Sequence, residues 1–325
     1  MSVEVLRPGM LTTLQDRGRL GCAILGVGTA GAMDDVASRL SNALVGNAAD
    51  ATVLEITLIG PRLRFGDAAT IALTGAAFPA HVGTVDVPMW CTVEIAAGGV
   101  LDVGTAQRGT RGYLAIAGGF AAERVLGSTS TDVNARLGGL HGRPLHEGDQ
   151  LAGGVAGQAR NASPIARHAP WSLDPRPWFD ANPVTPIRLI RGAHYDALDT
   201  ASRAALFEHD FPITPDSNRV GFRLNGPRLA LSTPIELVSE PLTAGTLQLP
   251  PGGQPIALMA EHPTIGGYPR IGHVAAVDRA LLAQRKPGDA VRFAEIGLDD
   301  AQTRYLERER ELERLIAAIH ERLIS

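Results

Sequence analysis

The sequence predicts a mostly β protein of two β-barrel lobes, with a few short helices and one C-terminal amphipathic helix. At 325 residues the chain is too long for one hydrophobic core of common size. Its 37 Gly and 22 Pro, against 5% aromatic residues, favour short strands joined by turns. Two short sequence motifs, called marks below, recur in the same order in the two halves of the chain. Gly60-Pro-Arg-Leu63 returns as Gly226-Pro-Arg-Leu229, and Glu147-Gly-Asp149 returns as Pro287-Gly-Asp289. Closed barrels follow because exposed strand edges invite association.

The N-terminal lobe is expected over residues 1–159, with one helix at 34–45. Residues 3–30 are extended and rich in turns. Asp34 can cap the first helical amides, apolar residues then recur at helical spacing, and Gly46 suits the left-handed position after the helix. Short strands between turn residues are expected at 54–58, 71–73, 92–95 and 112–116.

Residues 160–186 are predicted to be a linker, because six prolines fall in this segment. Proline fixes φ and removes a donor, so the segment should be extended and ordered by its two tryptophans rather than folded as an element.

The C-terminal lobe is expected over residues 187–298, with a helix at about 197–208. The tail, 299–325, reads as a charged amphipathic helix, which we expect to pack on its own barrel or, as the alternative, to bind a partner. Strands are expected at 187–190, 222–224, 235–239, 245–249, 256–260 and 290–293.

The composition excludes several function classes. The net charge is −4 without a long basic run, so we expect no nucleic-acid binding, and no apolar stretch reaches membrane-spanning length. Two cysteines favour a reducing, cytoplasmic location. Lys286 is the only lysine and lies in a turn, which excludes a P-loop and a biotin attachment site. The histidines lack metal-ligand spacing, so no metal site is expected.

Two polar clusters are candidate sites. In Gln15-Asp-Arg-Gly-Arg19, two arginines around a carboxylate could bind a substrate carboxylate or phosphate, or form only a turn with a surface ion pair. Ser217-Asn-Arg-Val-Gly-Phe-Arg223 is of similar type, and its alternative is a solvated strand edge. Gly26-Val-Gly-Thr-Ala-Gly31 matches a dinucleotide fingerprint, but no βαβ series follows it, so only an anion-receiving helix start remains.

A third candidate is Pro263-Thr-Ile-Gly-Gly-Tyr-Pro269, a glycine hinge whose amides can approach a ligand closely, with Tyr268 adding a ring and a hydroxyl. Glu261 and His262 precede this hinge, and by residue type they could serve as an acid and a base. Adjacent residues of a strand face opposite sides, so we do not expect these two to act together.

Seven motifs follow one another in order along the chain. They are Thr13-Leu-Gln-Asp-Arg-Gly-Arg19, Gly31-Ala-Met-Asp34, Ala43-Leu-Val-Gly-Asn47, Leu54-Glu-Ile-Thr-Leu-Ile-Gly-Pro61, Arg111-Gly-Tyr-Leu-Ala-Ile-Ala-Gly-Gly119, Leu126-Gly-Ser-Thr-Ser-Thr131 and Gly266-Gly-Tyr-Pro269. Together they resemble the family of 5-oxoprolinase C subunits, also called allophanate hydrolase subunit 2 or the carboxyltransferase domain of urea amidolyase. The resemblance runs from about residue 3 to residue 295. It implies cyclophilin-like β-barrel lobes and a partner, the B-type subunit, which is similar to allophanate hydrolase subunit 1.

The resemblance also implies membership of an ATP-dependent amidohydrolase complex that opens 5-oxoproline, or a related small cyclic amide, to glutamate. ATP is expected at the level of the complex. Alternatives are the carboxyltransferase part of a biotin-dependent urea or amide carboxylase, with biotin brought by another chain, and a non-catalytic regulatory role. We expect Asp16, Asp34 and Arg219 to be catalytic. The substrate-binding residues are expected to be Gln15, Arg17, Arg19, Gly31, Asn42, Arg223, Gln248, Thr264, Gly266, Gly267 and Tyr268.

Overall fold

The computed structural model describes residues 1–154 and 166–324, and within them the chain is mostly β, as predicted. It divides into two compact units. Unit 1 holds Met1–Leu20, Ala30–Ala181 and Leu312–Ser325; unit 2 holds Gly21–Thr29 and Asn182–Glu311. The lobe boundaries predicted at residues 159, 187 and 298 remain a prediction.

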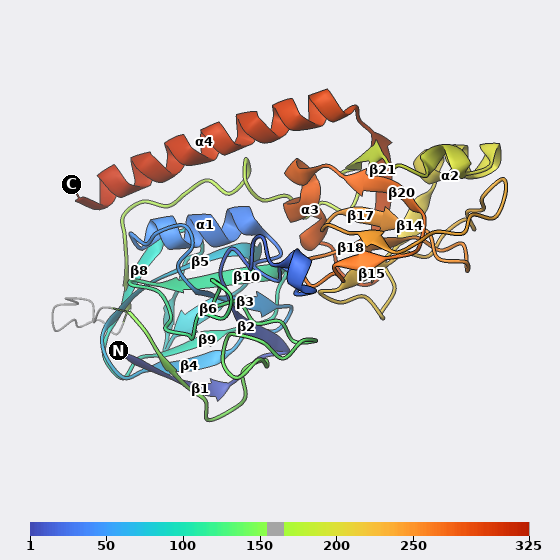
Figure 1. Ribbon diagram of the computed structural model, residues 1–325. Coiled ribbons are helices and arrows are strands. Elements are labelled where there is room, and N and C mark those ends of the chain that lie inside the picture. Colours follow the sequence, from blue (N-terminus) through green and yellow to red (C-terminus); the bar gives the residue numbers. More distant parts are fainter. Residues whose placement is uncertain (155–165, 325) are drawn as a thin grey trace. The chain divides into compact units, whose positions relative to one another are not determined.

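Unit 1 contains two six-stranded antiparallel sheets, seen in Figure 1. The first has the order β11-β1-β4-β9-β6-β7: β1 is Ser2–Arg7, β4 Arg62–Phe65, β6 Ala80–Val82, β7 Val85–Asp86, β9 Val100–Val103 and β11 Gln150–Ala152. The second has the order β12-β8-β5-β10-β3-β2: β2 is Leu11–Gln15, β3 Val53–Thr57, β5 Ala69–Ala77, β8 Thr92–Ile95, β10 Arg108–Ile116 and β12 Ala166–His168.

The core of unit 1 follows from the alternation of its strands. In β1, Val3 and Val5 point inward and are fully buried, while their neighbours are more exposed. The central strands β5 and β10 are buried along most of their length, because helix α1 (Asp35–Leu44) packs on them from the other side.

Helix α1 confirms the predicted helix at 34–45. The Asp34 carboxylate accepts the Ala37 amide at 3.0 Å, and Gly46 follows with φ +74°. Thr74 of β5 donates its hydroxyl to the Ala37 carbonyl at 2.7 Å, which ties the helix to the sheet.

Unit 2 contains a seven-stranded sheet of order β14-β21-β13-β20-β17-β18-β15, in which only the β13–β21 pair is parallel, and a separate two-stranded ribbon, β16 with β19. The sheet strands are β13 Ile187–Arg191, β14 Asp210–Pro212, β15 Gly221–Arg223, β17 Thr246–Gln248, β18 Ile256–Leu258, β20 Arg270–Val274 and β21 Ala290–Glu295. The ribbon strands are β16 Glu240–Pro241 and β19 Ile265–Gly266.

The remaining helices are short, apart from the last. The predicted helix at 197–208 is α2, Thr200–Glu208, preceded by a 3-10 turn, η2, at Tyr195–Ala197. Further turns of helix are η1 (Ala23–Leu25), η3 (Ala276–Asp278) and α3 (Arg279–Ala283). The tail helix is α4, Leu298–Ile324, and its Leu312 and Ile319 are buried. The helix from Leu312 onward belongs to unit 1 and not to the unit that it follows in the chain, where packing was expected.

Two element predictions were wrong. Residues 235–239 alternate in burial but form no strand, because no neighbouring strand within the described residues pairs with them; pairing starts only at Glu240. Within the predicted linker, Ala166–His168 do form a strand, β12, which pairs with the edge of β8. The linker residues 160–165 lie outside the described residues.

The second repeated mark has the same structure in both halves. Gly148 and Gly288 both have positive φ, +84° and +92°, and each precedes a strand. Asp149 accepts the His146 amide at 2.7 Å, and Asp289 accepts the Lys286 amide at 3.0 Å. The first mark does not repeat in this way: Gly60–Leu63 leads into β4, whereas Gly226–Leu229 forms no strand.

Candidate functional site

Asp16 follows β2 and organises the loop at 128–131. Its carboxylate accepts the Ser128 hydroxyl at 2.5 Å, the Ser130 hydroxyl at 2.6 Å and the Thr129 amide at 2.8 Å. It also accepts the Gly18 amide at 2.8 Å and the Thr129 hydroxyl at 3.1 Å. Burial opposes ionisation of this carboxyl, but the hydrogen bonds from Ser128, Ser130, Thr129 and Gly18 outweigh it and lower the pKa. Asp16 is therefore held as a carboxylate that positions this loop.

The two arginines of the first cluster have different environments. Arg19 is buried and donates from Nε to the Val125 carbonyl at 3.1 Å and from Nη2 to the Ser130 carbonyl at 2.5 Å. Arg17 is exposed and has no hydrogen bond or ion pair among the described residues. The alternative interpretation, a surface ion pair with Asp16, does not hold, because Asp16 accepts from the Ser128–Ser130 loop instead.

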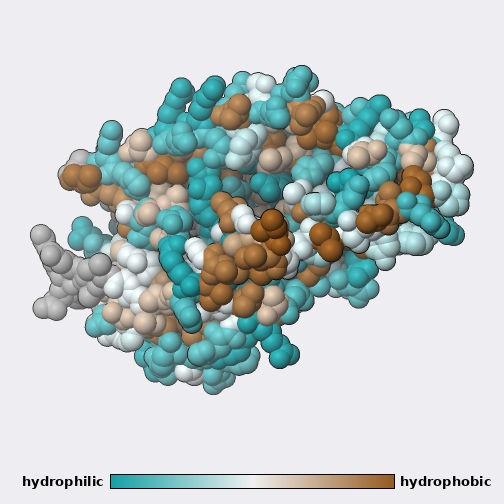
Figure 2. All heavy atoms as spheres, in the orientation of Figure 1, coloured by the Kyte–Doolittle hydropathy of each residue, from teal (hydrophilic) through white to brown (hydrophobic). Residues whose placement is uncertain are grey.

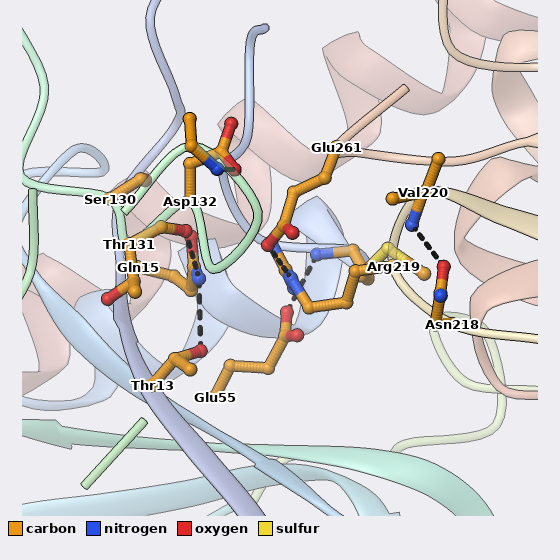
Figure 3. A network of polar contacts seen from close by, with 12 residues as sticks. Thr13, Gln15, Glu55, Ser130, Thr131, Asp132, Asn218, Arg219, Val220 and Glu261 are labelled. Atoms are coloured by element: carbon orange, nitrogen blue, oxygen red, sulfur yellow. Dashed lines mark hydrogen bonds and ion pairs between the residues drawn. The ribbon is translucent and has the colours of Figure 1, made fainter. Parts of the chain in front are cut away.

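Gln15 lies beside this loop, as Figure 3 shows. Its Nε2 donates to the Thr13 hydroxyl and to the Thr131 carbonyl, each at 3.0 Å. The side chain is fully buried, and its Oε1 has no hydrogen-bond partner in the described structure. A buried acceptor without a donor costs free energy of folding. This indicates that Gln15 has a role other than filling the protein interior.

Two glycines let neighbouring backbone lie close to the first cluster and to the 128–131 loop. A Cβ on Gly139, whose φ is +53°, would stand 1.9 Å from the Thr131 hydroxyl. Gly31, at φ +88°, lies against the Arg17–Gly18 backbone, where a Cβ would be 3.0 Å from the Gly18 nitrogen. Gly31 is therefore placed next to Asp16 by backbone approach, and the Ala32 amide donates to the Asp16 carbonyl at 3.0 Å.

A second polar network surrounds the start of α1. The Tyr113 hydroxyl donates to Glu55 Oε2 at 2.8 Å and accepts the Asp34 amide at 2.7 Å. Glu55 Oε2 also accepts the Met33 amide at 2.8 Å, and Arg111 lies 4.0 Å from the other carboxylate oxygen. Burial, with the nearby Glu55 and Asp34 carboxylates, raises the pKa of Tyr113 well above its ordinary value. Tyr113 therefore stays neutral and fixes the loop that carries Asp34.

Sequence reasoning missed Glu55, Tyr113 and Arg111 as site residues. Glu55 lies in the middle of the fully buried strand β3, and Tyr113 faces it in register on β10. A carboxylate inside an apolar strand was the available signal, because an acidic group is almost never fully buried unless it is paired. Asn42, which we expected to bind substrate, donates to the Ala51 carbonyl at 2.8 Å and accepts from Asn47 at 3.0 Å.

The second cluster lies in unit 2 and centres on Arg219. This buried arginine donates from Nε to Glu261 at 2.6 Å, while Asn218 accepts the Val220 amide at 2.8 Å, as drawn in Figure 3. Arg223 is exposed, and its guanidinium has no partner among the described residues; its backbone donates to the Ser217 hydroxyl at 3.0 Å. Arg219 thus has a structural ion pair in this unit, and Arg223 is available to an anion.

The glycine hinge forms strand β19 and its flank. Gly266 pairs with Glu240 in the ribbon, Thr264 accepts the Leu242 amide at 2.9 Å through its carbonyl, and Tyr268 is about half exposed. Gly267 has open space around it, since a Cβ there would meet nothing closer than 3.5 Å. Gln248 of β17 lies next to Gly266 and is buried.

Glu261 and His262 have separate partners. They lie in a turn and not in a strand, so the alternation on which the expectation about them rested does not apply. Glu261 binds Arg219, and His262 Nδ1 contacts the Pro263 carbonyl at 2.8 Å. Burial, and to a lesser extent the charge of Arg279, lowers the pKa of His262. This imidazole is neutral at pH 7.

Metal ligands do not gather on the described part of the chain. Within residues 1–154 and 166–324, His, Cys, Asp and Glu side chains nowhere form a group of three or more that could hold a metal ion. Lys286, the only lysine, is exposed in a turn. No helix in the described part of the chain is long and apolar enough to cross a membrane.

Apolar side chains are exposed around η1. This turn buries none of its residues, and Leu20, Ile24 and Leu25 are each more than half exposed. Figure 2 shows apolar side chains among polar ones on the face that it draws. Surface of this kind is often covered by another protein.

Comparison with known proteins gives concordant results. A family model described as carboxyltransferase domain, subdomain A and B, matches residues 25–295. The chain is 37% identical to the C subunit of 5-oxoprolinase from Escherichia coli, over 98% of this chain and 99% of that protein. It is 33% identical to the C subunit of 5-oxoprolinase from Haemophilus influenzae, over 92% of this chain and 93% of that protein.

A solved structure gives a similar result at the level of the fold. The urea carboxylase of Kluyveromyces lactis superposes with a TM-score of 0.86 and 27% identity over 98% of this chain. This chain spans only 29% of that protein. The similarity therefore covers one part of a much larger enzyme.

Proposed function

This chain belongs to the carboxyltransferase domain family with subdomains A and B, and from that premise we propose that it is the C-type component of an ATP-dependent amidohydrolase that opens 5-oxoproline to glutamate. One observation carries the proposal. The relatives named as C subunits of 5-oxoprolinase match 98% and 92% of this chain and 99% and 93% of their own length, at 37% and 33% identity. A related small cyclic amide is a substrate of the same chemical class.

The two clusters support a small anionic amide as the ligand. Arg17 and Arg223 are exposed guanidinium groups without partners among the described residues, and a guanidinium binds a carboxylate well. 5-Oxoproline carries one carboxylate. Its lactam carbonyl requires hydrogen-bond donors if negative charge is to develop on the oxygen.

ATP belongs to the complex in this proposal, and no step is derived through ATP on this chain. The sequence has no P-loop, and the described residues hold no metal-binding group. We propose that a B-type subunit, similar to allophanate hydrolase subunit 1, completes the site. We also propose that the complex works in the cytoplasm.

A second candidate function is carboxyl transfer in a biotin-dependent urea or amide carboxylase. The TM-score of 0.86 with a urea carboxylase supports it. Biotin would arrive on another chain, because the one lysine here is an exposed turn residue without a biotinylation motif. A non-catalytic regulatory role beside the partner is the third candidate.

Copurification with the partner tests these candidates. The chain, the B-type subunit and the lactam-handling component are purified together, and ADP release is measured with 5-oxoproline, with urea and with no substrate. We expect release that depends on 5-oxoproline and is accompanied by glutamate. ADP release that requires both urea and bicarbonate, with biotin supplied on another chain, would instead support carboxyl transfer.

A further inference from the structure

Gln248 and Arg270 of unit 2 each have a buried N–H donor, although the Arg270 side chain as a whole is 30% exposed. They face each other in register on the adjacent strands β17 and β20. Gln248 is 5% exposed, and its Nε2 has no hydrogen-bond partner among the described residues. The Nε of Arg270 is also buried and without an acceptor there. Two unsatisfied donors on residues that are paired in register are unusual, because a buried donor without an acceptor costs free energy.

The charge of Arg270 is already balanced. Its Nη2 contacts the Glu240 carboxylate, and its backbone amide donates to His194 Nδ1 at 3.1 Å. The guanidinium is thus anchored at one nitrogen, while its Nε–H is left for another acceptor. The pair offers two N–H donors but no net positive charge.

A glycine gives this pair its space. Gln248 Nε2 lies beside Gly266, where a Cβ would stand 3.0 Å from that nitrogen and 2.7 Å from Leu242 Cδ1. Gly266 belongs to the β16–β19 ribbon, which has only two residue pairs. Such a short ribbon is weak by itself.

We propose that Gln248 and Arg270 form a subsite for the carbonyl oxygen of a neutral amide. Two donors and no net charge suit a carbonyl oxygen, which accepts two hydrogen bonds without bringing a charge. A carboxylate would gain the same two bonds but would bury a negative charge that Glu240 repels.

The subsite deepens the proposed function, on which the identity of the amide rests. A lactam carbonyl bound there is polarised, because both donors bind its oxygen more strongly as negative charge develops on it. Gln248 was expected to bind substrate, and Arg270 is added by the structure. Binding of an amide to this subsite can therefore be measured without any turnover of 5-oxoproline.

The test uses the isolated chain and two probes, 2-pyrrolidinone and acetate. Nitrogen-15 spectra follow the side-chain amide of Gln248, identified by its loss in Gln248→Leu. We expect 2-pyrrolidinone to shift this signal and acetate at equal concentration to leave it in place. Gln248→Leu and Arg270→Lys, which lacks an Nε–H, should each weaken 2-pyrrolidinone binding by roughly tenfold or more.

Gln254 is the matched control. Its Oε1 accepts the Gly226 amide at 2.9 Å and its Nε2 donates to the Gly226 carbonyl at 3.1 Å. Gln254→Leu should lower the Tm and retain binding. Gln248→Leu should lose binding without lowering the Tm, since it removes a group that has no partner among the described residues.

Tighter binding of acetate than of 2-pyrrolidinone, or unchanged binding in both Gln248→Leu and Arg270→Lys, overturns the subsite. A complex that binds 2-pyrrolidinone yet releases no ADP with 5-oxoproline overturns the proposed function and leaves the subsite intact.

Discussion

At the scale of single residues, Asp16 is the side chain of the first cluster with the most hydrogen bonds. Its carboxylate accepts five hydrogen bonds, three of them from hydroxyl groups, and is 4% exposed. A carboxylate so fully occupied is a poor proton acceptor. Its catalytic role remains a prediction, and its structural role can be tested directly.

Asp16→Asn should destabilise the chain by about 2–4 kcal/mol, because an amide group replaces one acceptor and faces donors in the loop. The folded pKa of Asp16 lies below its unfolded value of about 3.9. The contribution of the carboxylate is therefore complete above that value and is lost as pH falls through the folded pKa.

Urea unfolding at a series of pH values measures this effect. The stability gap between wild type and Asp16→Asn should stay constant from about pH 8 to 5 and narrow below about pH 4. Asp174→Asn is the control, since Asp174 is exposed and bonds only Arg176 among the described residues. A gap that widened toward acid would contradict the assignment.

Sequence alone identified the residue types of the first site but not their partners. Gln15, Asp16 and Arg19 were expected to form a compact cluster, while the Ser128–Ser130 groups that bind Asp16 lie more than a hundred residues away. A sequence pattern does not show contacts between residues so far apart in the chain. The prediction placed the arginines around Asp16 because they are its neighbours in the sequence.

At the scale of elements, α4 shows how periodicity predicts a helix and its buried face. Leu312 and Ile319, seven residues apart, are 0% and 3% exposed, whereas Leu306 is 51% exposed. The helical spacing was visible in the sequence and predicted one apolar face, formed by Leu312, Leu315, Ile316, Ile319 and Leu323. Only Leu312 and Ile319 of this face are buried, and Leu323 is 38% exposed.

Leu312→Ala should lower the free energy of unfolding by about 2–5 kcal/mol, because it leaves a cavity in a closed environment. Leu306→Ala on the same helix should have almost no effect. Thermal unfolding of the two variants gives the comparison, and equal shifts in Tm would show that the helix does not pack through this face.

Strand prediction succeeded where apolar residues had a partner strand and failed where they did not. Thr92–Ile95 was predicted with its observed bounds as β8. Residues 235–239 also contain apolar residues, yet none of the five is buried and they pair with nothing in the described chain. Periodicity reports which residues can be buried, and pairing depends on what the rest of the chain brings alongside.

At the scale of the whole molecule, we expect the purified chain alone to show no turnover. The described residues offer no metal-holding group, and the carboxylates Asp16, Glu55 and Glu261 are all engaged. Steady-state ATP hydrolysis is the measurement, with 5-oxoproline present and absent. Hydrolysis that depends on 5-oxoproline and is catalysed by this chain without partners would contradict the expectation.

The division into units also has a consequence for synthesis. Unit 1 takes its last segment from Leu312 onward, and unit 2 takes Gly21–Thr29 from near the start of the chain. The early strands of unit 1 therefore emerge from the ribosome long before the last segment of unit 1 is synthesised. At about 5–20 residues per second, that wait lasts on the order of tens of seconds. The nascent first unit must stay unaggregated without its last segment for that whole interval.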